Sequence, residues 1–460
     1  MPFYIVLWGM RMGRIFVRDK SFYRAVLLLA LPVVAQNMIN IGVNIMDTWM
    51  LGSYGEIQLS GSSLANDFIN IFQILCMGMG GGAAVLTAQY WGRKDVGSLK
   101  RALAIMLRLA LGIALVFTLV TAAFPVWIME RYTNAADVVE KGRIYFLVSL
   151  PTYLLMGISL TLTLILRSVR NVVVPLATSI VCFFVNIFFN WVFIFGNLGA
   201  PELQIAGAAL GTVIARAVET AVIAVYVFGH EKKIGFRVRD LFRPCRDLIR
   251  PYMRYSVPVL LSDSMLAFGN TAVSMIIGHI SPYFVAANAI IAPIVRLSTV
   301  FTQGLGQASS VMTGNALGAG RREAAYRQGV TFFALSVLIG LFAAVVILLF
   351  SPFMIRHYNI TEETAEIARH LMFAVSIMVV FQSTQSVLTK GVLRGGGDTM
   401  FLLVADVAFL WIASVPLGAL AGLIWHLEPF YIYTFLKIDW AIKTFICAYR
   451  LKSQKWIRIV

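Results

Sequence analysis

Residues 25–52 read AVLLLALPVVAQNMINIGVNIMDTWMLG. From Ala25 the residues are mostly apolar for more than twenty positions, which is long enough for an α-helix to cross the ~30 Å hydrocarbon core of a bilayer. Asp47 closes this run. An ionised carboxylate in or near hydrocarbon is costly and is retained mainly where the charge has a function. The stretch therefore predicts a membrane helix that carries a functional acid.

The composition of the whole chain extends this interpretation. Of 460 residues, 59% are hydrophobic and 13% are charged, and the mean hydropathy is +0.81. A soluble protein of this size could not bury so much apolar surface, and a membrane β-barrel would show short alternating strands instead. The sequence predicts an all-α polytopic membrane protein with twelve spans: 24–50, 58–86, 102–128, 143–166, 172–196, 204–229, 254–278, 284–314, 328–351, 365–390, 400–425 and 430–449.

The basic residues predict the orientation of these spans. The net charge is +16, and Lys and Arg are concentrated in the N-terminus, in alternate loops and in the C-terminal tail. The opposite loops carry only Arg131, Lys141, Arg143, Arg356 and Arg369. By the positive-inside rule, both termini are expected on the cytoplasmic side of the cell (inner) membrane. The basic charge is thus a signal of topology, and no nucleic-acid partner is expected.

The chain contains an internal repeat. At a shift of 226 residues the matches include Pro32 with Pro258, Asn44 with Asn270, and Gly52 with Gly278; at a shift of 227, LRSVRN from residue 166 meets LRGGGD from residue 393. Each copy holds six predicted spans, so the two bundles are parallel repeats, an architecture typical of transporters. The predicted organisation is a lead-in (1–23), an N-lobe (24–229), a cytoplasmic linker (230–253), a C-lobe (254–449) and a tail (450–460).

Polar residues form a stripe on the first span. Gln36, Asn40, Asn44 and Asp47 follow at intervals of four, four and three, so they share one helical face. Such a face is costly against lipid and is expected to look into the bundle or into a wet cavity. We assign Gln36, Asn40 and Asn44 to a substrate cavity.

Further polar residues are expected at the depth of Asp47. Asn186 and Asn190 in the fifth span and Thr212 in the sixth fall in the outer half of the same bundle. Carboxylate, amide and hydroxyl oxygens suit a hard cation such as Na⁺, whereas a carboxylate deprived of water could carry H⁺. Two alternatives stay open from spacing alone: Asp47 could be solvated at the interface, and the amides could only join helices.

Charges elsewhere in the spans receive separate interpretations. Arg216 and Glu219, three residues apart, are expected to form a structural pair. Arg296 in the eighth span is assigned to the substrate cavity, where it would pair with Asp263 or Asp406 or bind an anionic group. Those two aspartates are assigned to the cavity as well.

Charges in the last predicted span indicate an irregular helix. Lys437, Asp439 and Lys443 are expected to mark a short or tilted helix whose charges face protein or the interface.

Several motifs resemble those of the MATE family, the multidrug and toxic compound extrusion transporters. They are DTWMLG from residue 47, AQYWGRKD from 88, GAALGT from 207 and KSQKWIR from 452, and the resemblance covers about residues 20 to 458. It implies twelve helices in two six-helix lobes and export of cationic and amphipathic compounds in exchange for H⁺ or Na⁺. No other cofactor is implied.

The resemblance also assigns a coupling site, with two departures. The family's N-lobe cation site matches Asp47, Asn186, Asn190 and Thr212, where Na⁺ is the only metal expected. Members often have aspartate in place of Asn190, so this chain favours H⁺. Members of the NorM branch carry a glutamate where Leu266 stands, which implies that the C-lobe coupling site of that branch is absent.

The sequence favours two other function classes less. A flippase for a lipid-linked saccharide, from the same superfamily, usually has more helices and more cationic residues in its cavity; Arg296 favours it, whereas twelve spans and the MDTWMLG motif favour the antiporter. A membrane-embedded enzyme is disfavoured because the chain has no HExxH, no GxSxG and no paired membrane aspartates. The expected partners are small organic cations or amphipathic molecules and membrane lipid, and a monomer is expected.

Overall fold

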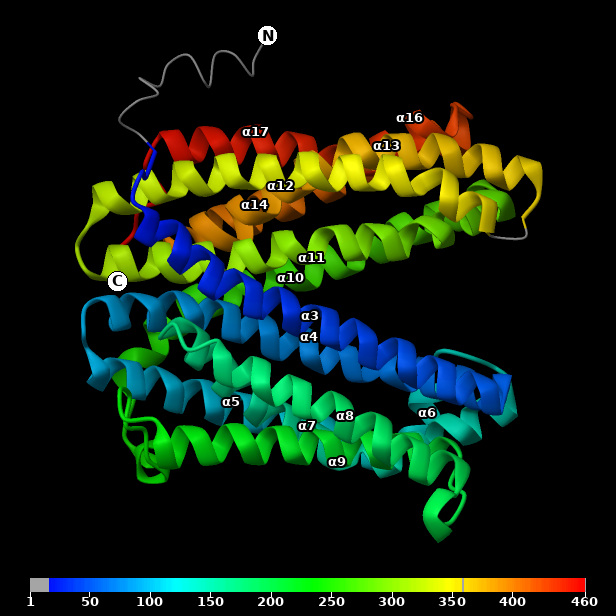
Figure 1. Cartoon of the computed structure of the whole chain (residues 1–460), viewed down its shortest axis with the longest axis horizontal. Coiled ribbons are helices and arrows are strands. Elements are labelled where there is room, and N and C mark those ends of the chain that lie inside the picture. Colours follow the sequence, from blue (N-terminus) through cyan, green and yellow to red (C-terminus); the bar gives the residue numbers. More distant parts are fainter. Residues whose placement is uncertain (1–15, 358–359, 460) are drawn as a thin grey trace. The chain divides into compact units, whose positions relative to one another are not determined.

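The computed structural model describes residues 16–357 and 360–459, and every regular element in these ranges is helical (Figure 1). Most of the predicted lead-in, residues 1–15, lies outside the described residues.

Eleven helices within the described residues are long and apolar enough to cross a membrane. They are α3 (Lys20–Tyr54), α4 (Glu56–Gly92), α5 (Val96–Ala123), α7 (Ala136–Ser168), α8 (Val173–Phe195), α9 (Ile205–Val225) continued by η2 (Tyr226–His230), α10 (Arg246–Ile280), α11 (Pro282–Gly318), α12 (Arg322–His357), α13 (Glu362–Ser386) continued by η4 (Val387–Leu393), and α14 (Thr399–Ala408) continued by η5 (Phe409–Ser414), α15 (Val415–Ala419) and η6 (Leu420–Ile424). The short helices α6 (Pro125–Glu130), η1 (Asn197–Gly199) and η3 (Val238–Phe242) lie between spans. The chain is therefore a multi-pass membrane protein of helices.

The twelfth predicted span is divided. Residues 430–449 fall in α16 (Pro429–Leu436) and α17 (Ile438–Lys452), separated at Lys437, whose φ of −122° and ψ of 15° are not helical. Asp439 and Lys443 are both 2% exposed. The prediction of a short helix whose charges face protein is confirmed, but the count of twelve continuous spans and their arrangement in two bundles remain predictions.

The described residues form two compact units. Unit 1 comprises the described residues up to Val34, Ala88–Lys94 and Val257 onward, and unit 2 comprises Ala35–Thr87 and Asp95–Ser256. The helices α3, α4 and α10 contribute residues to both units.

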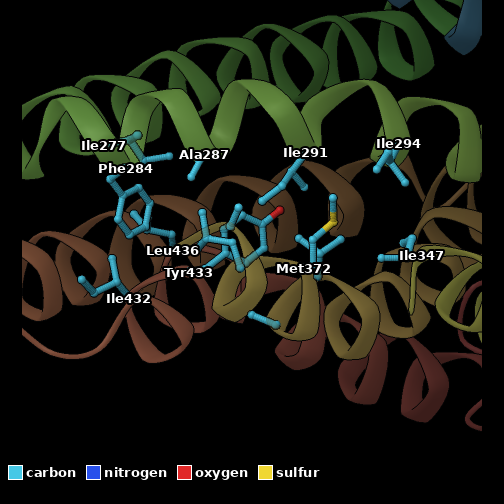
Figure 2. Packing of buried hydrophobic residues seen from close by; sticks show 14 of the residues in the cluster. Ile277, Phe284, Ala287, Ile291, Ile294, Ile347, Met372, Ile432, Tyr433 and Leu436 are labelled. Atoms are coloured by element: carbon cyan, nitrogen blue, oxygen red, sulfur yellow. The ribbon is translucent and has the colours of Figure 1, made fainter. Parts of the chain in front are cut away.

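Each unit has its own apolar core. In unit 2, Phe72 is fully buried and its ring meets that of Tyr153 edge-on at 5.3 Å, a favoured geometry for aromatic pairs. In unit 1, Ile291 of α11 and Met372 of α13 lie in one cluster with Tyr433 of α16, and Figure 2 shows these side chains converging between the helices. Close packing of such side chains holds the helices of each unit together, because within a bilayer helix association depends on van der Waals contact.

Matching contacts in the two units reflect the internal repeat. In unit 2, Arg167 Nη2 donates a hydrogen bond to Gln36 Oε1 at 2.6 Å. In unit 1, Arg394 Nη2 lies 3.2 Å from Asp263 Oδ1. Both pairs are separated by 131 residues along the chain. The arginine of the repeated LR motif therefore holds the first helix of its own repeat in both cases.

A second pair of contacts repeats in the same way. Gln36 Nε2 donates to Ser179 Oγ at 3.0 Å, and Ser262 Oγ donates to Asp406 Oδ2 at 2.7 Å. The separations are 143 and 144 residues. The same helix pair of each repeat is thus joined at the same level, although the residue types differ.

Candidate functional site

The Asp47 carboxylate meets the side chain of Asn190. Asn190 Nδ2 donates to Asp47 Oδ1 at 2.5 Å and also contacts Asn186 Oδ1 at 3.3 Å. Asn190 is fully buried and Asn186 is 2% exposed, whereas Asp47 is partly exposed. The structure therefore brings three of the predicted coupling residues into one hydrogen-bonded set that solvent reaches only from the side of Asp47.

Two parallel helices position this set. The contacts of Gln36 with Ser179 and of Asp47 with Asn190 both span 143 residues, so α3 and α8 run in the same direction and in constant register. Between these levels a Cβ on Gly42 would lie 3.2 Å from the Phe183 ring. The missing side chain of Gly42 allows α3 to lie close to α8.

The third helix of the site also depends on a glycine. A Cβ on Gly211 of α9 would lie 2.2 Å from Asn190 Oδ1, closer than any real contact. The next residue, Thr212, is partly exposed, and its hydroxyl interacts with that of Tyr145. Thr212 therefore borders the set formed by Asp47 and Asn190, and among the described residues it donates to neither of them.

One polar atom at the centre of the site stands out. Asn190 Oδ1 is buried and has no hydrogen-bond partner among the described residues. A buried carbonyl oxygen without a donor is costly and needs an explanation. This oxygen faces Gly211 of α9, and because its amide belongs to the same hydrogen-bonded set as a carboxylate, the set is a candidate for ion binding.

Sequence reasoning missed two polar residues of this region. Tyr145 of α7 is 3% exposed, and Asn66 Nδ2 of α4 donates to its hydroxyl at 3.1 Å. Asn66 was visible as a polar residue within the second predicted span, but nothing in its spacing pointed to Tyr145.

The charged residues of α9 form the expected pair. Arg216 Nη1 lies 2.6 Å from Glu219 Oε2, so the prediction of a structural pair is confirmed. Arg216 also lies close enough to act on Asp47 electrostatically. The guanidinium itself is held by Glu219 on the same helix.

The polar stripe of the first helix is split by the fold. Gln36 is 5% exposed and both of its polar atoms are engaged, by Arg167 and Ser179. Asn40 and Asn44 are exposed. Gln36 therefore joins helices in this structure, and its assignment to a substrate cavity, like that of Asn40 and Asn44, stays a prediction.

The expected pairing of Arg296 is also corrected. Asp263 pairs with Arg394, and Asp406 pairs with Ser262 and Lys443. Arg296 of α11 is exposed and contacts neither aspartate. The two carboxylates are taken by basic residues from helices late in the chain, which the spacing within one helix cannot reveal.

A hollow in the surface lies away from all of these residues. It has a volume of about 530 Å³ and is bordered by Glu130, Arg131 and Glu140, between α6 and the start of α7. None of the predicted site residues lines it. Among the described residues, no group of three or more His, Cys, Asp or Glu side chains is placed to hold a metal ion.

Comparison with known proteins places this geometry in a family. A family model described as MatE matches residues 32–192 and again residues 258–420. The chain is 24% identical over 394 residues to the probable multidrug resistance protein NorM of Thermotoga maritima, covering 85% of this chain and 83% of that one. It is 28% identical over 418 residues to the protein of the same name from Mesorhizobium japonicum, covering 86% of each.

Solved structures show the same fold. The outward-facing conformation of a multidrug resistance MATE family transporter of the MOP superfamily matches with a TM-score of 0.85 at 17% identity, covering 96% of this chain and 99% of that one. A MATE transporter of Vibrio cholerae matches with a TM-score of 0.86 at 15% identity, covering 95% and 98%.

Proposed function

Because the chain belongs to the MatE family, we propose that it is a secondary antiporter of the cell membrane that exports organic cations and amphipathic drugs in exchange for H⁺ or Na⁺. The relatives named as multidrug resistance proteins support drug export. The eleven apolar helices among the described residues support a multi-pass membrane location. Both termini and the linker at 230–253 are proposed to be cytoplasmic, on the evidence of the basic loops. The two repeats are proposed to rock against each other as two six-helix bundles.

The observation that carries the exchange mechanism is the pairing of Asp47 with Asn190. A carboxylate within a spanning helix accepts one hydrogen bond, at 2.5 Å, and a buried carbonyl oxygen beside it has no partner among the described residues. An ion that enters here would satisfy the oxygen and neutralise the carboxylate at once. We therefore propose Asp47 as the coupling residue, with Asn186, Asn190 and Thr212 as its neighbours.

The ligand set favours H⁺ over Na⁺. Asp47 is the single carboxylate of the set, because Asn190 stands where a second acid would strengthen a sodium site. Hard cations prefer several oxygen ligands with enough negative charge among them. A proton needs only the carboxylate and one acceptor.

Ion binding supplies enough energy to drive a change of conformation. A charged aspartate at the centre of a membrane helix costs about 2.5–3.5 kcal/mol on the lower of the measured scales. Because each 1.4 kcal/mol corresponds to about a factor of ten, neutralising Asp47 can shift a two-state equilibrium roughly a hundredfold. In this scheme the outward-open state takes up the ion and releases the substrate, and the return to the inward-open state delivers the ion inside.

The proposal is tested by transport in vesicles that contain the purified protein. Gradients of H⁺ and Na⁺ are imposed separately, and uptake of a fluorescent organic cation is followed. We expect the H⁺ gradient to drive transport and the Na⁺ gradient to have little effect. Transport that ignores both gradients would contradict the antiport.

The position of Arg296 favours a second candidate function, the translocation of a lipid-linked saccharide. Its guanidinium is exposed on α11 and pairs with neither Asp263 nor Asp406, which is the arrangement needed to bind an anionic group such as the diphosphate of a lipid-linked saccharide. Translocation of such a lipid in vesicles, lost in Arg296→Ala, would favour the flippase. Unchanged transport of organic cations by Arg296→Ala is expected for the antiporter.

A further inference from the structure

Unit 1 contains a buried chain of five polar side chains. Ser262 donates to Asp406 Oδ2 at 2.7 Å, Lys443 Nζ lies 3.3 Å from Asp406 Oδ1 and 2.8 Å from Asp439 Oδ2, and Ser414 donates to Asp439 Oδ1 at 2.8 Å. None of the five is more than 3% exposed. Both carboxylate oxygens of Asp406 and both of Asp439 therefore have a polar partner, and the ammonium of Lys443 lies between the two acids.

The helices that supply these residues are irregular at the same level. Directly after α14, which carries Asp406, the chain continues as the π-helical segment η5, which ends at Ser414. Asp439 lies in the first turn of α17, just after the break at Lys437. π-Helical segments are frequent at functional sites, and ion sites of transporters are often built on discontinuous helices. The buried chain is therefore placed where the backbone departs from a regular helix.

The internal repeat relates this buried chain to the surroundings of Asp47. Matching hydrogen bonds set the register of the last helix: Thr220 Oγ1 donates to Leu155 O at 2.9 Å, and Thr444 Oγ1 donates to Phe381 O at 3.1 Å. Thr444 therefore takes the place of Thr220, and Lys443 takes the place of Glu219. In the first repeat, Glu219 holds Arg216 on its own helix. In the second repeat a base stands at this place, and it extends to Asp406 and Asp439.

We propose that the ammonium of Lys443 acts as an internal cation between Asp406 and Asp439, so that the second repeat takes no H⁺ or Na⁺ from solution during the transport cycle. The first repeat, in which Asp47 accepts a hydrogen bond from Asn190 and forms no salt bridge among the described residues, is then the one that exchanges an ion. This inference deepens the proposed function and rests on it for its role in transport, but the occupancy of the site by Lys443 can be tested without transport.

The charges around these five buried side chains balance without an ion from solution. Lys437 acts electrostatically on Asp439 and Lys443, while its Nζ lies 3.4 Å from Asn270 Oδ1 and 5.1 Å from the centre of the Trp440 ring. Cys447 is the other titratable group that faces Asp406. Two ammonium groups thus balance two carboxylates. Without Lys443, two buried acids would face one position and would have to recruit a cation.

The experiment uses chemical rescue in a chain in which Asp47 is already replaced by asparagine. The melting temperature of purified Asp47→Asn/Lys443→Ala is measured in detergent at constant ionic strength, with Na⁺, methylammonium, ethylammonium or tetramethylammonium chloride. We expect methylammonium or ethylammonium to raise it by several degrees, because a primary ammonium can donate to both carboxylates and binding to the folded state stabilises it. Tetramethylammonium, which has no N–H group, should have no effect.

Two further variants test whether the response to these ions is specific to the site of Lys443. Asp47→Asn/Lys452→Ala removes an exposed lysine of the same helix and should show no specific response to these ions. Adding Asp439→Asn to the Lys443→Ala variant should restore part of the lost stability and abolish the response to primary ammonium ions. If Lys443→Ala yields no folded protein, adding Asp439→Asn or expressing in methylammonium is expected to recover it.

A different set of results would overturn the proposal. Equal effects of tetramethylammonium and methylammonium, no ion effect at all, or a further loss of stability on adding Asp439→Asn would show that Lys443 contributes only packing. Because all variants carry Asp47→Asn, these outcomes do not depend on ion exchange at Asp47. Failure of the antiport in vesicles would instead leave the chemical rescue intact.

Discussion

Asn190 donates its side-chain N–H to the Asp47 carboxylate at 2.5 Å, while its own carbonyl oxygen is buried without a hydrogen-bond partner among the described residues. The same side chain thus presents a donor to the acid, while its acceptor faces Gly211 of α9. The two residues can be tested separately, since the carboxylate supplies charge and the uncharged amide supplies a donor and an acceptor.

Replacing Asp47 by asparagine should uncouple transport from the ion gradient. Asp47→Asn mimics the neutral, ion-bound form, so the protein should insert normally, whereas H⁺-driven efflux should fall by at least about tenfold, the factor that 1.4 kcal/mol represents. The measurement is uptake in vesicles with and without the gradient. Asp67→Asn, which removes an exposed acid from α4, is the matched control and should retain the response. Full gradient-driven efflux by Asp47→Asn would place coupling elsewhere.

Replacing Asn190 by aspartate should shift the ion preference towards Na⁺. A second carboxylate at this buried position gives the site the negative charge that a sodium ion requires. Asn190→Asp should therefore gain transport driven by a Na⁺ gradient, or a melting temperature that rises with Na⁺ and not with choline. Asn134→Asp adds an acid at an exposed position between α6 and α7 and serves as the control. The preference for H⁺ would lose its basis if Asn190→Asp remained insensitive to Na⁺.

The sequence could predict that Asp47, Asn186 and Asn190 lie together because their relationship is expressed by spacing and depth. Helical periodicity places Asp47 on one face of its span, and the alternating direction of the spans places Asn186 and Asn190 at a similar level. The internal repeat was equally visible, because glycines and prolines keep their positions in both copies. These features are local or periodic, and the sequence records them directly.

The ion pairs of unit 1 could not be predicted in this way. Asp263 and Asp406 were expected to meet Arg296, but they meet Arg394 and Lys443. Which basic side chain reaches a buried acid depends on how helices far apart in the chain are packed. The close approach of Gly211 to Asn190 is of the same kind, since a glycine in an apolar span gives no sign of the residue opposite it.

The linker supplies a prediction of pH dependence outside the membrane. Asp240 of η3 is 2% exposed. Burial acts to raise the pKa of its carboxyl group, but the backbone N–H of Arg237 and the charges of Lys100 and Arg243 outweigh this and hold the pKa below the ordinary value of 3.8. A carboxyl group with a lowered pKa stabilises the folded state above its ordinary pKa, and this contribution is lost as the pH falls through the lowered value.

Hydrogen exchange of the backbone amides of Val238–Phe242 checks this expectation. Protection should be constant at neutral pH and should decrease in acid below the ordinary pKa of aspartate, whereas Asp240→Asn should show reduced protection already at neutral pH. Asp247→Asn is the control, because Asp247 is 61% exposed in its pair with Arg101 and such pairs contribute little. Equal protection of Asp240→Asn and the unmodified chain at neutral pH would contradict the role assigned to Asp240.

Adding one methyl group at Gly211 should disturb the site without touching any charge. The new Cβ would lie 2.2 Å from Asn190 Oδ1 and 3.0 Å from its backbone nitrogen, so either α9 or the amide must move. Overpacking of this kind costs about 1–3 kcal/mol, and a displaced Asn190 would no longer hold the Asp47 carboxylate. Gly211→Ala is therefore expected to lower both the melting temperature and the gradient-driven efflux.

Gly112→Ala in α5 is the matched control: a Cβ there would meet nothing within 4 Å, and alanine in a helix is more stable than glycine by roughly 0.5–1 kcal/mol. If Gly211→Ala transported as well as Gly112→Ala, the position of Asn190 relative to α9 would not matter for coupling, and the buried carbonyl oxygen would have to act without the constraint that this glycine imposes.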